Sequence, residues 1–521
     1  MIITLSSLFV EEGYVLALYI LILLCFLIPS APSCDIIMSM AKYLRLCYQY
    51  FFDNLVTVLL LPTFAVALFK VLCLTSDELG ALYSLVDSVD AFYVVLYSFA
   101  LIFLATIYFM SRSRPVYLVD FVCFKPPAEL RFSTEKFMKH SSLMLDFDPS
   151  NVEFQRKILE RSGLGEDTAL PPAQHAVPYA PSMTASRDEA ELVLFSLVDS
   201  LFKKTKIKPR DIDILVVNCS LFSPTPSLSA MIVNRYKMRS DVRSYNLSGM
   251  GCSAGLISID LARDELQVHQ SAYALVLTTE IISEHWYTGN DRSKLVANCL
   301  FRMGGAAVLL TNKRREGWRA KYELLHLVRT HKGADDTSYH CVFQEEDEVG
   351  KAGILLSKDL MAIAGGALKA NITTIGPLVL PLSEQILFFL SVAGRKLINP
   401  KWRPYVPDFT KAFEYFCIHA GGRAVIEELA RNLRLSEEQV EASRMTLHRF
   451  GNTSSSSPWY ELGYVEAKGK MRRGDRVWQI GLGSGFKCNS AVWRCLRAVP
   501  KDDHSAWADC IGKYPVPVTP V

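Results

Sequence analysis

The chain has 521 residues, of which 50% are hydrophobic and 21% are charged, and its formal net charge is +3. This near balance and the scattered positions of the basic residues argue against a nucleic-acid-binding protein. The 13 cysteines are odd in number and irregularly spaced. They argue against a disulfide framework and predict a reducing compartment for the main body.

Three uncharged apolar stretches occupy the first 110 residues, at 14–28, 54–69 and 91–110. The first is short for a membrane span, and the second extends to about residue 74 if Lys70 snorkels. The third has 20 residues without a charge, which is long enough to cross a hydrocarbon core of about 30 Å. We therefore expect helices at about 54–74 and 91–110.

The charges around these stretches predict their orientation. Basic residues precede the second stretch and follow the third, while the segment between them is acidic and has no Lys or Arg from 71 to 111. The positive-inside rule then favours a hairpin anchor, residues 41–113, with both ends in the cytosol. The body that follows is expected to face the cytosol. The residues concerned are Lys42, Arg45, Arg112 and Arg114 (basic) and Asp77, Glu78, Asp87 and Asp90 (acidic).

Residues 1–40 allow three interpretations. They are a third span, a signal-like segment, or a start-site artefact with Met38 or Met40 as the true start. Glu11 and Glu12 precede the apolar run, so the basic n-region of a secretory signal is missing.

From residue 114 the sequence alternates strand-like and helix-like segments, which favours a layered α/β fold. Ser186 with Glu189 predicts a capped helix to about residue 204, and Ser436 with Gln439 predicts another helix start. A looser region at 360–410 contains an amphipathic helix at 384–397 that is rich in Phe and Leu. Three roles are open for it: lining a lipid-sized cavity, touching the membrane, or packing in the core. Strands are expected at 115–123, 214–219, 273–278, 305–310, 322–328, 412–418 and 476–480.

The stretch NLSGMGCSAG, residues 246–255, places Cys252 between small residues where a strand gives way to a helix at 256–266. Gly249, Gly251 and Gly255 allow a sharp turn and the close approach of a substrate. A position near a helix N-terminus favours a thiolate over a thiol. The competing interpretation is a small buried hydrophobic cysteine.

Two partners for this cysteine stand out. His419 ends an apolar strand in FCIHAGG, where the glycines leave room beside the imidazole, although most such histidines are core residues. Asn452 lies in RFGNTSSSSPW, where the alternative is a turn former in a solvated serine-rich surface loop. A Cys, a His and an Asn on separate loops form a set suited to acyl transfer, in which the Cys takes the acyl group.

These three motifs, in this order, resemble the plant 3-ketoacyl-CoA synthases, the condensing enzymes of very-long-chain fatty acid elongation. The resemblance covers about residues 40–500. The further matching segments are FMSRSRPVYLVDF, NCLFRMGGAA, VRTHKGADD and GLGSGFKCNSAVW.

The resemblance implies a thiolase-like fold, with a duplicated βαβαβαββ five-layer core whose halves would be 114–390 and 391–515. It implies an acyltransferase of the endoplasmic reticulum membrane that condenses a long-chain acyl-CoA with malonyl-CoA in making wax, cuticular or membrane lipids. No metal or redox cofactor is expected. The expected partners are membrane lipid, a second copy in a homodimer, and the reductases and dehydratase of an elongase complex.

The resemblance also implies site residues. Cys252 would carry the acyl group, while His419 and Asn452 would bind the thioester oxygen of malonyl-CoA. His331 and His448 match histidines associated with activity, and Tyr415 stands where relatives can have a third histidine. The implied substrate-binding residues are Gly251, Arg302, Gly421, Gly422, Gly481, Gly483, Ser484 and Gly485.

Two alternatives keep the same motifs. One is a type III polyketide synthase-like or ketoacyl-carrier-protein synthase-like condensing enzyme. The other is a non-catalytic member of the elongase complex, an alternative that Tyr415 leaves open.

Overall fold

The computed structural model describes residues 69, 75, 91–111, 113–143, 148–397, 399, 401–402 and 405–517. The chain divides into two compact units, residues 1–112 and 113–521. The predicted second apolar helix, 54–74, and residues 1–40 lie outside the described residues, apart from Phe69.

In the first unit, helix α5 (Ala91–Ser111) coincides with the third apolar stretch and has no charged residue. Where the structure describes its side chains, the large hydrophobic ones are exposed, Phe99 and Leu101 among them. Within the described residues, no helix is both long and apolar enough to cross a membrane. The predicted hairpin stays a prediction, because its first helix, 54–74, lies outside the described residues apart from Phe69.

In the second unit, nine described strands form one sheet in the order β3-β2-β4-β5-β1-β6-β11-β10-β9. The earlier strands along the chain make one half of this sheet and the later strands make the other. The strands are β1 (Val116–Cys123), β2 (Ile214–Asn218), β3 (Arg243–Leu247), β4 (Tyr273–Thr279), β5 (Gly305–Thr311), β6 (Tyr322–His331), β9 (Tyr415–Ile418), β10 (Arg476–Gly483) and β11 (Lys487–Cys495).

The two halves repeat one pairing pattern, which confirms the layered α/β prediction. β2 pairs parallel to β4, β4 antiparallel to β5, and β5 antiparallel to β1. In the later half β9 pairs parallel to β10, β10 antiparallel to β11, and β11 antiparallel to β6. β1 and β6 join the halves. Strand order therefore places β6 with the later half, ahead of the division expected near residue 390.

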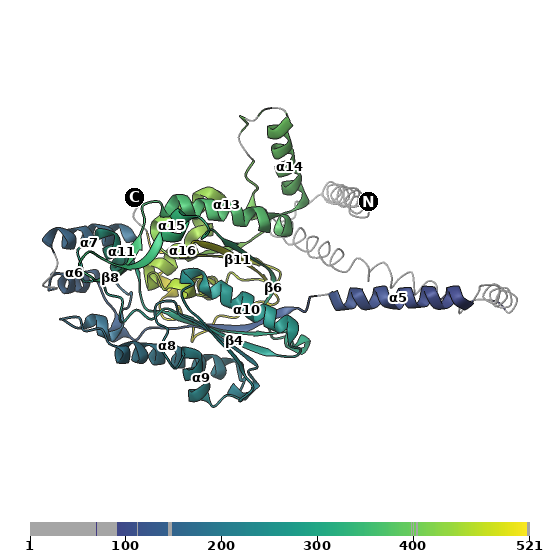
Figure 1. The fold of residues 1–521 in the computed structure, drawn as a ribbon, viewed down its shortest axis with the longest axis horizontal. Helices are drawn as coiled ribbons and strands as arrows, with labels where there is room; N and C mark the ends of the chain where they lie inside the picture. Colours follow the sequence, from purple (N-terminus) through teal and green to yellow (C-terminus); the bar gives the residue numbers. More distant parts are fainter. Residues whose placement is uncertain are drawn as a thin grey trace, which may run out of the picture. The chain divides into compact units, whose positions relative to one another are not determined.

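Two helices form a central layer between the half-sheets. α10 (Ala254–Val268) and α17 (Ser457–Ala467) each pack against strands of both halves, and every residue of α17 is buried. Outer helices cover the other faces (Figure 1). These are α8 (Met183–Thr205) and α9 (Leu228–Tyr236) on the first half, and α13 (Leu360–Val379), α15 (Arg423–Leu433) and α16 (Glu437–Phe450) on the second.

One predicted helix start is wrong and another is confirmed. α8 begins at Met183, because Ser182 Oγ accepts a hydrogen bond from Ala185 N–H at 3.1 Å. Ser186 and Glu189 lie inside the helix and are buried, where Glu189 accepts from the backbone of Ile282 and Ser283. The capping box of Ser436 and Gln439 is present at the start of α16.

Smaller elements complete the body. A two-stranded hairpin, β7 (Val342–Glu346) and β8 (Ala352–Leu356), was not expected from the sequence. The predicted helix at 384–397 is present as α14 (Leu382–Leu397). The other helices are α6 (Thr134–Ser142), α7 (Pro149–Ser162), α11 (Arg292–Leu300) and α12 (Asp336–His340).

Candidate active site

Cys252 lies in the 3-10 turn Gly251–Ser253, directly before α10. Gly251 has φ +68°, and a Cβ there would lie 2.5 Å from the backbone nitrogen of Ser484. A Cβ on Gly255 would lie 2.3 Å from the carbonyl oxygen of Ser455. These glycines therefore let the nucleophile turn pack against the protein's own backbone, whereas the sequence predicted clearance for a substrate.

A cavity of about 420 Å³ opens at Cys252. The β7–β8 hairpin, the glycine-rich loop after β10 and the end of β6 contribute to its walls. Lining residues include Gly251, Cys252, Glu280, Phe301, His331, Phe343, Ile354, Ser454, Ser484, Gly485 and Lys487. The other described cysteines do not line it.

Burial raises the pKa of the Cys252 thiol to about 12. A hydrogen bond with Ser454 lowers this pKa, while the negative charge of Glu280 raises it. Desolvation disfavours the charged form of the sulfur, and here it outweighs the favourable bond. At neutral pH the resting group is a thiol, so the predicted resting thiolate is wrong. A base must take the proton when the sulfur attacks.

Glu280 is a buried carboxyl group beside this thiol that the sequence interpretation missed. It accepts the backbone N–H groups of Ser220 and Leu221 at 2.7 Å each, and the hydroxyl of Ser454 at 2.9 Å. Burial raises the pKa of Glu280. The sequence did contain a signal for it: Glu280 directly follows the fully buried strand β4. Buried charged residues are rare in proteins unless they are paired, so an acidic residue at this position indicates a special role.

Replacing Glu280 by glutamine should make Cys252 more reactive. Removing the carboxylate removes a negative charge that raises the thiol pKa, so the thiolate fraction at a given pH increases. We expect iodoacetamide to alkylate the Cys252 peptide several-fold faster than in the parent chain between pH 7 and 9, as followed by mass spectrometry. Glu348→Gln, in the exposed β7–β8 turn, is the control, and an unchanged or slower rate in Glu280→Gln would contradict the assignment.

His419 follows the last residue of β9 and is buried. A Cβ on Gly421 would lie 2.9 Å from its Nε2, so the expected clearance beside the imidazole is present. Burial lowers the pKa of His419 to about 4, and the ring is therefore neutral near pH 7.

The tautomer of His419 follows from its partner. Ser457 Oγ donates to the Ser454 carbonyl at 3.0 Å and lies 2.7 Å from His419 Nδ1. Since that hydroxyl has one proton to donate, its oxygen accepts from Nδ1–H. The lone pair of the neutral ring is then on Nε2, which makes this nitrogen a proton acceptor in the resting site.

Asn452 is held by backbone groups on both sides. Its N–H donates to Leu300, and its carbonyl accepts from Arg302 N–H at 2.9 Å. In the side chain, Oδ1 accepts from Ser454 N–H at 2.9 Å, and Nδ2 donates to the Gly421 carbonyl at 3.0 Å. That bond uses one of the two Nδ2 hydrogens, and the second is a neutral donor of fixed orientation.

The serine run connects the three residues, and its burial excludes the alternative of a solvated surface loop. Residues 452–458 are all buried. Ser454 bonds the Cys252 thiol and Ser457 bonds His419. Ser455 Oγ lies 2.6 Å from Thr278 Oγ1 and donates to Asn218 Oδ1 at 2.9 Å. Both of those partners belong to the first half, so the run carries polar contacts across the duplicated core.

Comparisons with known proteins agree with this geometry. A family model described as "FAE1/Type III polyketide synthase-like protein" matches residues 108–397, and one described as "3-Oxoacyl-[acyl-carrier-protein (ACP)] synthase III C terminal" matches 410–495. The chain is 62% identical to 3-ketoacyl-CoA synthase 5 of Arabidopsis thaliana, over 91% of this chain and 96% of that protein. It is 60% identical to 3-ketoacyl-CoA synthase 6 of the same plant, over 94% and 98%. The chain belongs to the 3-ketoacyl-CoA synthase family.

Solved structures show the fold of this family member. The C-terminal type III polyketide synthase domain of Steely1 from Dictyostelium aligns with a TM-score of 0.58 at 16% identity, covering 73% of this chain and 99% of that domain. 1,3,6,8-Tetrahydroxynaphthalene synthase from Streptomyces coelicolor aligns with a TM-score of 0.58 at 17% identity, covering 73% and 100%. The duplicated α/β core is thus thiolase-like.

Of the two further family-associated histidines, only His331 lines the cavity. Partial burial lowers the pKa of His331, as do the charges of Lys487 and Arg329. His448 lies on α16, where its Nδ1 is 3.2 Å from the Tyr514 hydroxyl. Its carbonyl accepts from Gly165 N–H, so its contacts are with the supporting structure.

Neither Tyr415 nor Arg302 lines the cavity. Tyr415 begins β9 and is four residues before His419, a separation of about 13 Å along an extended strand. Its hydroxyl donates to the Lys470 carbonyl at 2.8 Å. The guanidinium of Arg302 is buried and donates to Thr168 Oγ1 and to the carbonyls of Asn298 and Phe301. Its predicted substrate contact is therefore replaced by a structural one.

Tyr415→Phe should retain condensation activity within about twofold. The change removes one partly exposed hydrogen bond, worth about 1 kcal/mol of stability, and leaves the cavity untouched. Product formation and the thermal unfolding midpoint of the purified variant would be measured together. A loss of tenfold or more at an unchanged midpoint would restore a chemical role to this position.

The remaining predicted substrate-binding residues divide by position. Ser484 and Gly485 line the cavity. A Cβ on Gly483 would lie 2.6 Å from the Ser253 nitrogen, so this glycine lets the nucleophile turn pack on β10, and Gly481 lies against Leu256. Gly422 caps α15, and a Cβ there would meet only Leu300.

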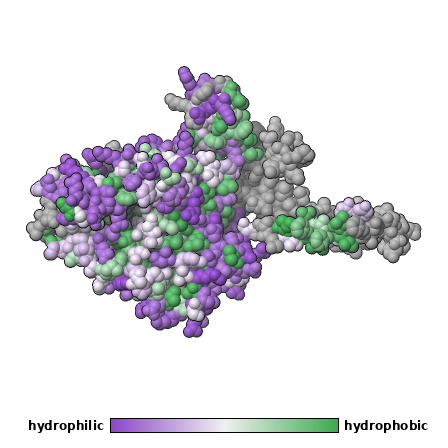
Figure 2. Space-filling view, in the orientation of Figure 1, coloured by the Kyte–Doolittle hydropathy of each residue, from purple (hydrophilic) through white to green (hydrophobic). Residues whose placement is uncertain are grey.

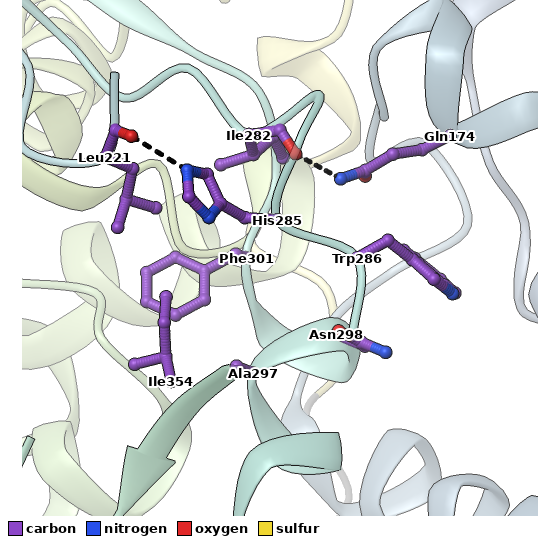
Figure 3. Close-up of a pocket in the computed structure, with 9 residues that line it drawn as sticks. All are labelled: Gln174, Leu221, Ile282, His285, Trp286, Ala297, Asn298, Phe301 and Ile354. Atoms are coloured by element: carbon purple, nitrogen blue, oxygen red, sulfur yellow. Dashed lines mark hydrogen bonds between the residues drawn. The ribbon is translucent and has the colours of Figure 1, made fainter. Parts of the chain in front are cut away.

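A second, smaller pocket of about 10 Å³ adjoins the main cavity (Figure 3). Leu221, Phe301 and Ile354 line both spaces. Beyond them, His285 Nε2 donates to the Leu221 carbonyl at 2.8 Å. Burial lowers the pKa of His285. The three shared side chains form the wall that ends the main cavity on this side.

Proposed function

We propose that this chain condenses a long-chain or very-long-chain acyl-CoA with malonyl-CoA to give a 3-oxoacyl-CoA two carbons longer, CO2 and CoA. One observation carries the proposal. The chain belongs to the family of 3-ketoacyl-CoA synthases, and among its described cysteines Cys252 is the one that lines a cavity of about 420 Å³. In the serine run, Ser454 bonds both the Cys252 thiol and the Asn452 side chain, and Ser457 bonds His419.

In the first half-reaction the Cys252 sulfur attacks the acyl-CoA carbonyl. The bond from that carbonyl to CoA sulfur breaks, and an acyl-Cys252 thioester forms. The thiol proton leaves the sulfur, and the departing CoA sulfur gains one. We assign the intermediate proton position to His419 Nε2, because it is the unprotonated nitrogen of a neutral ring. The raised pKa of Cys252 makes such a base necessary.

In the second half-reaction malonyl-CoA loses CO2, and the electron pair of the broken bond becomes an enolate. His419 Nε2 takes up a proton from solvent, and this N–H and the free Nδ2–H of Asn452 then stabilise the enolate oxygen. The carbanion attacks the acyl-Cys252 carbonyl, the bond from that carbonyl to the Cys252 sulfur breaks, and the sulfur takes the proton from His419 Nε2. Decarboxylation itself supplies the carbanion, so the proposal includes no metal or redox cofactor.

The direct test uses microsomes from yeast that express the chain, labelled malonyl-CoA and saturated acyl-CoA of defined length. We expect a labelled 3-oxoacyl product two carbons longer that is missing with Cys252→Ala. Cyclised products of repeated malonyl additions would favour a polyketide synthase-like enzyme. No product from any acyl-CoA, together with an unreactive Cys252 thiol, would favour a non-catalytic elongase component.

We propose further that the protein works as a homodimer at the endoplasmic reticulum membrane, with its catalytic body in the cytosol beside elongase reductases and a dehydratase. The order of charges around the N-terminal apolar stretches supports this placement. Carbonate extraction and protease protection of intact microsomes would test it. Release of the full chain by carbonate, or protection of residues after 113, would contradict the placement.

Ile354→Ala should shift products toward longer chains. Removing this side chain opens the wall between the main cavity and the His285 pocket, so a longer acyl group fits. We expect the ratio of longer to shorter products to rise at least threefold by gas chromatography. Val349→Ala, in the exposed turn of the same hairpin, is the control. An unchanged ratio would show that the chain terminus does not reach this wall.

A further inference from the structure

Helix α14 stands out from the catalytic body (Figure 1), and many of its large apolar side chains are exposed. Phe389 is 70% exposed and Leu397 is 81% exposed. Hydrophobic residues gather along one side of the projecting segment, and hydrophilic residues lie at its outer end (Figure 2). The exposed apolar residues are Leu378, Leu382, Ile386, Leu387, Phe388, Phe389, Leu390, Val392, Leu397 and Trp402. A patch of this extent on a soluble surface marks an interaction site.

Hydrogen bonds and close packing fix α14 to the chain that follows it, so its exposed side chains belong to an ordered helix. At its base the fully buried carboxylate of Glu384 accepts the Tyr405 hydroxyl at 2.6 Å and Asp408 N–H at 2.9 Å, and it pairs with Lys411. Further along, Ser391 Oγ accepts Tyr405 N–H at 2.9 Å. The returning chain also packs closely: a Cβ on Gly394 would lie 2.7 Å from the Trp402 ring.

The charges of α14 and of the residues on either side of it indicate what covers the apolar side chains. Among the described residues from 378 to 402, the exposed or half-buried charged side chains are Arg395, Lys396 and Lys401, which are all positive. The one acidic residue there, Glu384, is buried and paired. A second copy would bring the same positive charges against these, which disfavours self-association. An anionic lipid surface matches both the apolar side and the cations.

We propose that α14 lies in the headgroup boundary of a membrane and holds the catalytic body on a lipid surface. The helix does not cross the bilayer: its apolar side enters the acyl region, and the basic groups at its end face lipid phosphates. This contact goes beyond the proposed reaction and is separate from the N-terminal apolar stretches, because it involves residues of the catalytic body alone.

The test replaces Phe389 with the photoreactive p-benzoylphenylalanine in the full-length chain, expressed and irradiated in yeast microsomes. We expect mass spectrometry to find phospholipid attached to the peptide that contains position 389. The yield should be at least tenfold above that at Val349, an equally exposed apolar position in the β7–β8 turn. Equal lipid yields, no lipid adduct at 389, or an adduct to a second copy or another protein would each overturn the proposal. Condensation measured on the same microsomes reports separately on the proposed function.

Discussion

Cys252→Ala abolishes condensation, with an expected loss on the order of 10⁴-fold or more in the rate of 3-oxoacyl-CoA formation. The reason is that the reaction passes through a bond to this sulfur, and the other described cysteines lie outside the cavity. Cys252→Ser should also fail, because a hydroxyl beside Glu280 is a far weaker nucleophile than a thiol. Labelled malonyl-CoA incorporation at matched protein levels measures the effect.

The control for this substitution is Cys123→Ala. Cys123, in β1, is the other half-buried cysteine of the described residues, and it lies outside the cavity lining. We expect it to keep most of the activity. If Cys252→Ala retained more than a tenth of the parental rate, the assignment of the nucleophile would be wrong.

Asn452→Asp should lower turnover at least a hundredfold, the second-largest effect that we expect. The amide offers a neutral N–H to an oxygen that becomes negative, whereas a carboxylate offers a like charge. Losing one such donor typically costs about 3 kcal/mol, and added repulsion increases the loss. The hydrogen bond from Nδ2 to the Gly421 carbonyl is also lost, so the thermal midpoint must be reported with the rate. Asn432→Asp, on the exposed face of α15, is the matched control.

A second readout separates the roles of these two residues. Cys252 is needed to hold the acyl group, while Asn452 is needed when malonyl-CoA loses CO2. Cys252→Ala should therefore still release CO2 from malonyl-CoA, and Asn452→Asp should lose both reactions. Equal decarboxylation by Asn452→Asp and the parent would show that the enolate oxygen is bound elsewhere.

The sequence predicted the elements whose signal is local. The run at 273–278 is apolar throughout because β4 is buried on both faces, and the structure has it at Tyr273–Thr279. The apolar helix after Cys252 and the capping box of α16 are likewise present. Asn452 and His419, which the sequence singled out as partners of Cys252, are both buried, and their linkage through Ser454 and Ser457 was not expected.

What the sequence could not predict depends on distant partners. Serines in a row are usually solvated, but Ser455 is buried because Thr278 and Asn218 bond its hydroxyl. Ser186 and Glu189 have the spacing of a capping box, but Ser182 caps the helix one turn earlier, and Ser186 is buried in the core. The reactivity of Cys252 was misjudged because a helix start favours a thiolate, while burial and Glu280 act more strongly in the opposite direction.

The acyl-enzyme itself tests the central claim most directly. The purified full-length chain in detergent would be mixed with a saturated long-chain acyl-CoA, without malonyl-CoA, and its peptides analysed by mass spectrometry. We predict one acyl group in thioester linkage on the Cys252 peptide, and its release as a 3-oxoacyl-CoA two carbons longer when malonyl-CoA is added. An acyl group on another residue, or an acyl-Cys252 that malonyl-CoA does not discharge, would contradict the account.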